Sequence, residues 1–427
     1  MRGRLNLFQA AMLRWRELHP YNAVHVAELP LPFDAARLQR AIAEHVTEQG
    51  LTGLVLDVAS RRFEYRGGPA HPDLTIVAPG PDPEAALDVE MSRQLNLPFP
   101  VSGGFDPFRF FALPGATTFY LGIAYDHFIA GGDSIVVLLK GIAARYAGTA
   151  IASSPPDVHP RGYAKLFLRN ALAFYFGQFW LPAMILRARR SIRPRYPYGD
   201  AGENAYVSLA VAPAAYVAIK RTANAWGVTQ NDLMVAMLLK AVAPEIEGRD
   251  MHQRRHEIAI ASVFNIRREV APGPERAFGQ FLSSFLVSHP MPAGMHLREV
   301  ATDIHAQTQR IKRRKLYLQT LYAIAFGGLA WRYMQPHQRK QMYAKNYPVW
   351  AGMTMLNVDN LWRDAPGTAA ITRYLRAGST GPFSPLVVTP AAVGDNLRIG
   401  ISYRTAAFRR DDVVRIGAAL VACADSL

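Results

Sequence analysis

The residues best suited to chemistry lie between Phe119 and Ser134, in the sequence FYLGIAYDHFIAGGDS. Large side chains alternate with smaller or polar ones from Phe119 to Asp126, and this period of two predicts a strand with two different faces. His127 follows at once, so the pattern places an imidazole at a strand end, where it can exchange a proton near neutral pH. The plainer interpretation is a histidine whose ring nitrogens are satisfied by hydrogen bonds, and a lone histidine leaves both open.

The glycine pair after this histidine predicts a tight loop leading into a helix. Gly131 and Gly132 permit a sharp turn or a close approach to another group. Asp133 or Ser134 can then cap the helix that follows. An apolar stripe typical of a buried helix face continues to Gly148, formed by Ile135, Leu138, Leu139 and Ile142. We therefore expect a strand and a helix to fix the histidine loop from both sides.

This stretch resembles the HHxxxDGxS signature of the condensation-domain superfamily. That superfamily includes nonribosomal-peptide condensation domains, chloramphenicol-acetyltransferase-like enzymes and bacterial wax ester synthase/diacylglycerol acyltransferases. Position by position, Asp126 replaces the first histidine, and His127 matches the second, which the family uses as catalytic base. Gly131 stands where the motif has its aspartate, and Gly132 matches the glycine.

Ser134 matches the serine of the motif, and Asp133 fills its free position. In the family the aspartate is mainly structural, because it orients the loop through an arginine. Since Gly131 offers no carboxylate, we predict that Asp133 replaces that aspartate. It would either hold the loop through Arg267 or cap the helix itself.

The length of 427 residues predicts two domains, or one pseudo-duplicated unit. Strand and helix patterns alternate along the chain, which indicates an α/β fold. The resemblance implies two chloramphenicol-acetyltransferase-like lobes, each a mixed β-sheet packed with helices, with the active-site channel between them. We assign residues 1–165 to the lobe with the histidine motif, 166–199 to an apolar and basic interdomain segment, and 200–427 to the second lobe.

Shorter sequence motifs in the second lobe resemble motifs of the same family. GVTQNDLMVA is similar to a wax ester synthase motif, and Thr229 and Asp232 within it have the spacing of a capping box. A strand at 257–264 leads to Arg267, resembling the "PVSLR" strand end, and TMLNVDN keeps Asn357 of "SNVPGP". The resemblance implies two groups of site residues: a catalytic group of His127, Asp133 and Ser134, and a substrate-binding group of Arg267, Asn357, Tyr125 and Gly132.

Two apolar, aromatic-rich stretches are flanked by basic residues, at 166–186 and 316–334. The first is nearly long enough to span a membrane, but Arg169 and Pro182 within it argue against a span. It is either a buried interdomain helix or an interfacial membrane helix. Both stretches favour peripheral association with an anionic membrane on its cytoplasmic side, and we expect a lipid-like substrate there.

The net charge of +15 favours polyanionic partners such as an acidic carrier protein, anionic lipid or a phosphorylated cofactor. A single cysteine, Cys423, excludes an intramolecular disulfide framework and is compatible with a reducing cytoplasm. We find no classical signal peptide, GxSxG elbow, P-loop, HExxH helix or cysteine pair, so serine-hydrolase, phosphate-loop and common zinc sites lack support. We expect no metal and no nucleic-acid partner, because no recognisable binding module accompanies the basic runs.

The resemblance implies an acyltransferase that moves an acyl group from a thioester to a hydroxyl or amine of a lipid-like acceptor. The donor would be acyl-CoA or a phosphopantetheinyl acyl-carrier protein acting as co-substrate, with no bound cofactor. His127 would take the proton as the acceptor attacks the thioester carbonyl. The alternative is a catalytically silent condensation-like protein that binds a carrier protein or a lipid partner, because the first histidine and the aspartate of the motif are both replaced.

Overall fold

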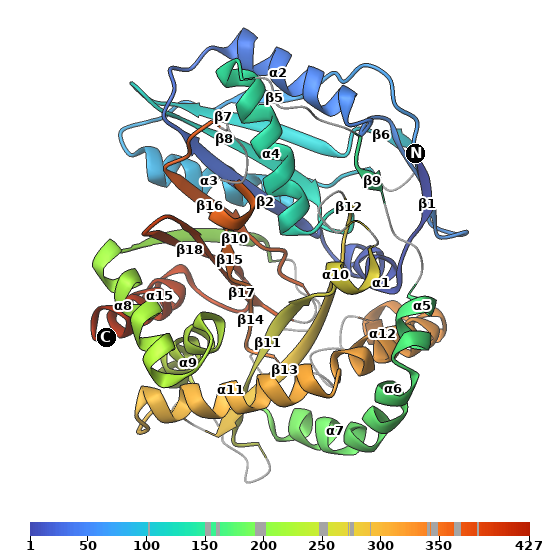
Figure 1. The fold of residues 1–427 in the computed structure, drawn as a ribbon, viewed down its shortest axis with the longest axis vertical. Coiled ribbons are helices and arrows are strands. Elements are labelled where there is room, and N and C mark those ends of the chain that lie inside the picture. Colours follow the sequence, from blue (N-terminus) through green and yellow to red (C-terminus); the bar gives the residue numbers. More distant parts are fainter. Residues whose placement is uncertain are drawn as a thin grey trace.

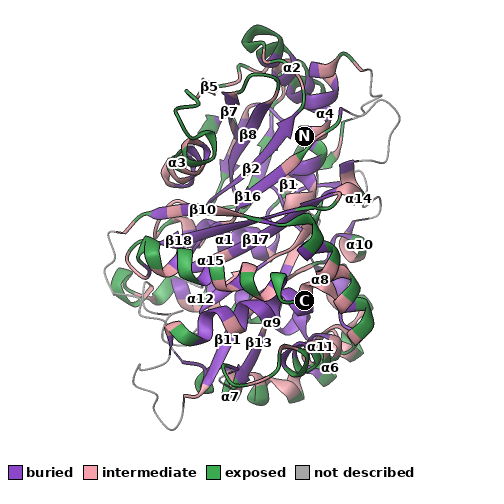
Figure 2. Ribbon diagram, turned by 90° about the vertical axis from the view of Figure 1, so that its left-hand side faces the viewer, coloured by how far each residue is buried: buried purple, intermediate pink, exposed green. Residues whose placement is uncertain are grey.

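The structure is a computed structural model that describes residues 1–100, 103–149, 155–158, 163–192, 202–246, 255–271, 273, 277–290, 292–339, 342, 349–362, 369–381 and 384–427. It confirms the predicted α/β class, with two lobes that each contain a mixed sheet covered by helices (Figure 1). Residues 193–199 of the predicted interdomain segment lie outside the described residues. The central strands are buried on both faces (Figure 2).

The first lobe is built on a five-stranded sheet in the order β16-β2-β8-β7-β5. Its strands are β2 (Asn22–Leu29), β5 (Leu74–Ile76), β7 (Phe108–Pro114), β8 (Phe119–Asp126) and β16 (Arg373–Ala377). Helices α2 (Ala35–Glu48) and α4 (Gly132–Ala147) cover one face, and α3 (Pro83–Asn96) covers the other. The alternation in β8 matches these layers, because Leu121 and Ile123 join the α2–α4 core while Tyr120 and Ala124 join the α3 core.

Strand β16 comes from the second half of the chain yet completes the sheet of the first lobe. It pairs antiparallel with β2, and Arg376 lies opposite His25 in this register. Figure 1 shows β16 in orange beside the blue strand β2. The lobes are therefore joined by shared strand hydrogen bonds as well as by chain connections.

The second lobe contains a larger sheet in the order β10-β18-β17-β14-β11-β13, with β15 also paired to β17. Its strands are β10 (Asn204–Val211), β11 (Glu257–Asn265), β13 (Leu282–Pro290), β14 (Ala351–Met353), β15 (Leu356–Asn357), β17 (Leu386–Val393) and β18 (Asn396–Arg404). Its helices include α8 (Pro213–Trp226), α9 (Gln230–Val242), α11 (Leu297–Arg313) and α15 (Arg410–Asp425). The predicted cap of α9 is confirmed, since Thr229 accepts a hydrogen bond from the amide of Asp232 at 3.2 Å.

Smaller elements surround these two sheets. A four-stranded sheet has the order β1-β4-β3-β6, and β9 pairs with β12 in a separate two-stranded sheet. The elements are β1 (Arg2–Arg4), α1 (Leu7–Arg16), β3 (Leu54–Asp57), β4 (Arg62–Tyr65), β6 (Gly104–Phe105), β9 (Asp157–Val158), α10 (Arg267–Val270), β12 (Ala277–Phe278) and α14 (Asp359–Trp362). The β9–β12 pair joins the end of the segment assigned to the first lobe to a segment of the second.

The two apolar stretches form a layer of helices at one side of the molecule. The first is broken into α5 (Ala164–Arg169), α6 (Ala171–Gly177), a 3-10 turn (Gln178–Trp180) and α7 (Leu181–Arg190), while the second is the single helix α12 (Tyr317–Tyr333). Pro182 falls in the first turn of α7, where proline is tolerated. Within the described part of the chain, no helix has the length and apolarity needed to cross a membrane.

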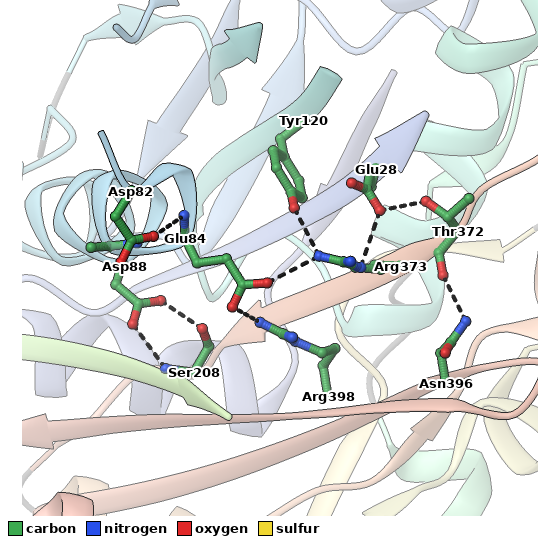
Figure 3. A network of polar contacts seen from close by, with 11 residues as sticks. Glu28, Asp82, Glu84, Asp88, Tyr120, Ser208, Thr372, Arg373, Asn396 and Arg398 are labelled. Atoms are coloured by element: carbon green, nitrogen blue, oxygen red, sulfur yellow. Dashed lines mark hydrogen bonds and ion pairs between the residues drawn. The ribbon is translucent and has the colours of Figure 1, made fainter. Parts of the chain in front are cut away.

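A polar network ties α3 of the first lobe to β16 of the same lobe and to β18 of the other sheet (Figure 3). Glu84 accepts bonds from Arg373 at 3.0 Å and Arg398 at 2.7 Å, and Arg373 also lies 3.4 Å from Glu28. Glu84 is about half exposed, with 47 % of its side chain accessible. The contact is therefore an interlobe clasp that water can reach.

Candidate functional site

His127 follows the last residue of β8 and is fixed through its own backbone. Its amide donates to the Tyr21 carbonyl at 3.0 Å, and its carbonyl accepts from Nε2 of Gln280 at 2.8 Å. The ring is half-buried, with the rings of Tyr21 and Tyr125 at centroid distances of 6.0 and 6.1 Å. The imidazole thus lies where β8, the segment before β2 and the segment before β13 meet.

The surroundings of this ring favour its neutral form. Burial, and after it the cation of Arg376, lower the pKa of His127 to about 4, whereas the Ala130 carbonyl acts in the opposite direction. Nδ1 is buried and makes no hydrogen bond of normal geometry with the described residues. At neutral pH the ring is therefore unprotonated and can accept a proton.

A layer of buried polar side chains lies beneath this histidine. Nδ1 of His25 is 2.8 Å from the Tyr374 hydroxyl, and its Nε2 is 3.3 Å from that of Tyr125. Burial lowers the pKa of His25 well below its usual value, assisted by Arg376 and by His127. His25, Tyr374 and Arg376 were not predicted from the sequence, although Arg376 in the strand segment RYLRA was a usable signal.

Asp126, at the position of the first motif histidine, binds helix α1 through its side chain. It forms a buried ion pair with Arg16, the last residue of that helix. Burial raises the pKa of Asp126 to about 6, and the Arg16 cation opposes this shift. Our interpretation is that this carboxylate anchors the end of β8 to α1.

Arg267 reaches the histidine loop, but through Ser134. Its guanidinium donates to Oγ of Ser134 at 2.6 Å and to the Ala277 carbonyl at 2.7 Å. The loop is held again where the amide of Gly131 donates to the Gly279 carbonyl at 2.9 Å. Burial lowers the pKa of Arg267, and the nearby carboxylate of Asp133 opposes the shift. Arg267 therefore links the start of α10 to the first turn of α4.

Asp133 does not cap α4, so that expectation is wrong. The N-cap residue is Gly131, which provides no side-chain bond, and Asp133 already lies within the first turn. Its carboxylate accepts a hydrogen bond of 2.6 Å from Nδ2 of Asn265. An acidic group at this turn favours the helix through the helix dipole. The hydrogen bonds of Arg267 described above go to Ser134 and Ala277, so Asp133 acts on it through its charge.

Gln280 occupies the space that a motif aspartate would need. Its Nε2 donates to the carbonyls of His127 and Ala130, at 2.8 and 3.2 Å. A Cβ atom added at Gly131 would lie only 3.0 Å from Oε1 of Gln280. A larger side chain at position 131 therefore requires Gln280 to move. Gln280 and the Arg267–Ser134 bond therefore both hold the loop.

The remaining predicted binding residues have different surroundings. A Cβ atom at Gly132 would approach Arg376 to 3.2 Å and the His25 ring to 3.4 Å, so this glycine allows the helix start to pack on both. Tyr125 is buried against His25. Asn357 is exposed, and its side chain accepts from the amide of Asp359 at 3.1 Å, a local turn contact. No group of His, Cys, Asp and Glu side chains that could hold a metal occurs among the residues the structure describes.

Solved structures of similar fold cover almost the whole chain. The first condensation domain of the CDA synthetase matches with a TM-score of 0.69 over 99 % of this chain and 95 % of that domain, at 13 % identity. The chain has the condensation-domain fold. SgcC5 protein from Streptomyces globisporus matches this fold with a TM-score of 0.68 and 15 % identity, over 99 % and 98 % of the two chains.

A third structure with the condensation-domain fold is the starter condensation domain of rhizomide synthetase, in complex with C8-CoA and Leu-SNAC. Its TM-score is 0.67 at 14 % identity, over 100 % of this chain and 94 % of that domain. No protein-family model and no curated relative matches the sequence. Identities this low establish the fold alone.

Proposed function

We propose that this protein is an acyltransferase that moves an acyl group from a CoA or carrier-protein thioester to a hydroxyl or amine. We include a lipid-like acceptor in the proposal because helices α5, α6, α7 and α12 expose large apolar side chains. The observation that carries the proposal is the half-buried, neutral imidazole of His127, on a loop that Gln280 and Arg267 fasten. The condensation-domain fold supports it, because a domain of this fold has been solved with C8-CoA.

In this proposal His127 is the general base. The acceptor oxygen or nitrogen attacks the thioester carbonyl carbon while the free imidazole nitrogen takes its proton. The carbon–sulfur bond then breaks, and the leaving thiolate receives that proton as a thiol. No covalent acyl-enzyme is required. The low pKa of His127 keeps the ring unprotonated at neutral pH, so the base is ready in nearly every molecule.

The second candidate is a catalytically silent protein of the same fold that binds a carrier protein or a lipid. It is favoured by the two altered motif positions, since Asp126 pairs with Arg16 and Gly131 provides no carboxylate. The positioning of the loop by Gln280 and Arg267 favours the enzyme instead, because a silent protein gains nothing from a fixed imidazole.

The test is to incubate the purified protein with acyl-CoA thioesters of several chain lengths and with hydroxyl and amine acceptors, and to detect products by mass spectrometry. We expect His127→Ala to lower the rate about 100- to 10,000-fold. His71→Ala is the matched control, because His71 is exposed and should leave the rate unchanged. A His127→Ala protein as fast as wild type would eliminate the mechanism. Saturable thioester binding without product in any pairing would support the silent protein.

A further inference from the structure

The surface formed by α5, α6, the 3-10 turn, α7 and α12 is apolar where the rest of the described surface is mostly polar. We call it the aromatic face. Eleven of the eighteen exposed large hydrophobic residues in the described chain lie on it. They are Leu168, Leu172, Tyr175, Phe176, Phe179, Ile185, Leu186, Tyr322, Phe326, Leu329 and Tyr333. Contiguous apolar area of this kind marks an interaction site.

The aromatic face is one surface, because its two chain segments pack together. The rings of Phe174 and Tyr322 have centroids 5.6 Å apart, and the side chains of Gln178 and Gln319 share a 2.8 Å hydrogen bond. These helices lie together in Figure 1, at the side of the molecule below α1. The face is therefore continuous across α6 and α12.

Helix α12 is apolar on both sides, but only one side is covered. Leu318, Leu321 and Trp331 are buried, whereas Phe326 and Tyr333 have 66 and 82 % of their surface exposed. A helix that is hydrophobic all round is normally buried. No described residue covers the outer side of this one, so it is suited to a partner outside the chain.

Charge identifies the class of partner. Residues 164–190 and 312–339 contain eleven lysine and arginine residues and no aspartate or glutamate. Lys315 and Arg339 pair with Glu269 and Glu17 at the margin, at 3.1 and 3.4 Å. The side chains of Arg189, Arg190 and Arg313 make no hydrogen bond or ion pair with any described residue. A second copy of this chain would carry the same positive charge, which disfavours self-association through this face.

An apolar cavity of about 360 Å³ lies directly under the aromatic face, between α7, α11, α12 and β13. Its walls include Met184, Ile185, Phe285, Ile311 and Ala323. Cavities that hold small molecules measure roughly 300–1,000 Å³, so this one is large enough for part of an apolar chain. Ile185 belongs both to the cavity wall and to the exposed face, so the two are continuous.

We propose that the aromatic face docks the protein on an anionic membrane. The exposed Phe, Tyr and Leu side chains enter the headgroup region, and the surrounding arginine and lysine residues meet the lipid phosphates. The adjoining cavity offers a place for an acyl chain of a bound lipid. This proposal holds whether or not the protein transfers acyl groups, and it requires no spanning helix.

The experiment is flotation of the full-length protein with vesicles of phosphatidylcholine, with or without phosphatidylglycerol, at low and high salt. Wild type should float with the anionic vesicles at low salt and much less at high salt. Phe176→Ser/Phe179→Ser/Phe326→Ser should lower its partition coefficient at least about a hundredfold. The control Val58→Ser/Val89→Ser/Val414→Ser changes hydrophobic residues that are also exposed but lie elsewhere, and it should bind as wild type does.

A second set of variants tests how much the positive charges contribute to membrane binding. Arg189→Gln/Arg190→Gln/Arg313→Gln should weaken binding to anionic vesicles about a hundredfold, since each cation contributes a factor of about five. Arg40→Gln/Arg66→Gln/Arg221→Gln removes exposed arginines elsewhere and should have a much smaller effect. Circular dichroism and melting curves verify that every variant is folded.

Three results would overturn the proposal. The first is wild-type protein that stays at the bottom of the gradient with anionic vesicles at low salt. The second is equal loss of binding in the phenylalanine and valine variants. The third is a stable dimer in light scattering that the phenylalanine variant alone dissociates, because the face would then be a subunit interface.

Discussion

The loop around His127 and the clasp around Glu84 both join the lobes with polar side chains, yet their surroundings differ. At the loop, Arg16, Asp126, Arg267 and Gln280 are buried or nearly so. At the clasp, Glu84 is half exposed to water. Removing one partner from a buried pair leaves an uncompensated charge, whereas water replaces a partner at the surface. Polar contacts of the same kind should therefore contribute very different amounts to the free energy of unfolding at the loop and at the clasp.

The largest effect on stability should follow from breaking the buried pair beside His127. Arg16→Met leaves the Asp126 carboxylate without its cation, and we expect a loss of about 3–5 kcal/mol in the free energy of unfolding. Urea denaturation of wild type and variant measures it. Arg40→Met, at an exposed position on α2, is the control. A loss below about 1 kcal/mol would mean that the centre is no more sensitive than the clasp.

The second prediction concerns how activity depends on pH, because the buried surroundings of the loop shift the pKa of His127. Because the pKa of His127 is about 4, the loss of activity that comes from protonation of its ring should occur as pH drops through about 4. An unshifted histidine would lose activity near pH 6.5, and at pH 4.5 only about 1 % of it would be unprotonated. The pH profile of kcat/KM measures the pH at which activity falls. Arg376→Met should move this fall to higher pH, since Arg376 helps to lower the pKa of His127.

The third prediction tests the substitute for the motif aspartate. Gln280→Ala removes the bonds to the His127 and Ala130 carbonyls and leaves both without that donor. We expect a loss of about 1–3 kcal/mol in stability, together with a lower kcat. Gly131→Asp alone should be destabilising because of the contact with Gln280, and the double variant with Gln280→Ala should recover part of that loss. Strict additivity of the two changes would contradict the shared space.

The smallest effect should come from the clasp. Glu84→Gln removes the negative charge that Arg373 and Arg398 share but keeps an acceptor, so we expect a loss of about 1 kcal/mol or less. That loss should shrink further in high salt, because exposed charges are screened. Denaturation at two salt concentrations is the measurement. A salt-independent loss of several kcal/mol would place the clasp in the same class as the buried centre.

Local patterns allowed much of the fold to be predicted. The alternation in 119–126, the helix after the glycine pair and the Thr229 cap all depend on residues close in sequence, and all are confirmed. Arg267 was correctly placed at the histidine loop through its motif position. Its partner was not predicted, because Ser134 and Asp133 are neighbours and only the geometry of the first turn distinguishes them.

What could not be predicted depends on residues far apart in the chain. Gln280 lies 153 and 150 positions from His127 and Ala130, the loop residues that it binds, and His25 meets Tyr374 only because β16 pairs with β2. The repeating patterns of neighbouring residues cannot predict such long-range contacts. Composition alone identified the apolar stretch at 166–186 but left open whether it is buried, and the structure exposes many of its side chains. Its division into three helices depends on Pro182 and on packing against α12.

The contribution of β16 to the first sheet also bears on how the protein is made. Folding during synthesis proceeds from the N-terminus, so most of the first lobe emerges from the ribosome long before residues 373–377 do. Until then β2 presents an unpaired edge, which is a template for pairing with a neighbouring chain. A nascent chain stalled before residue 373 should therefore depend on chaperones. For the same reason, a fragment that ends at residue 165 should aggregate when expressed alone.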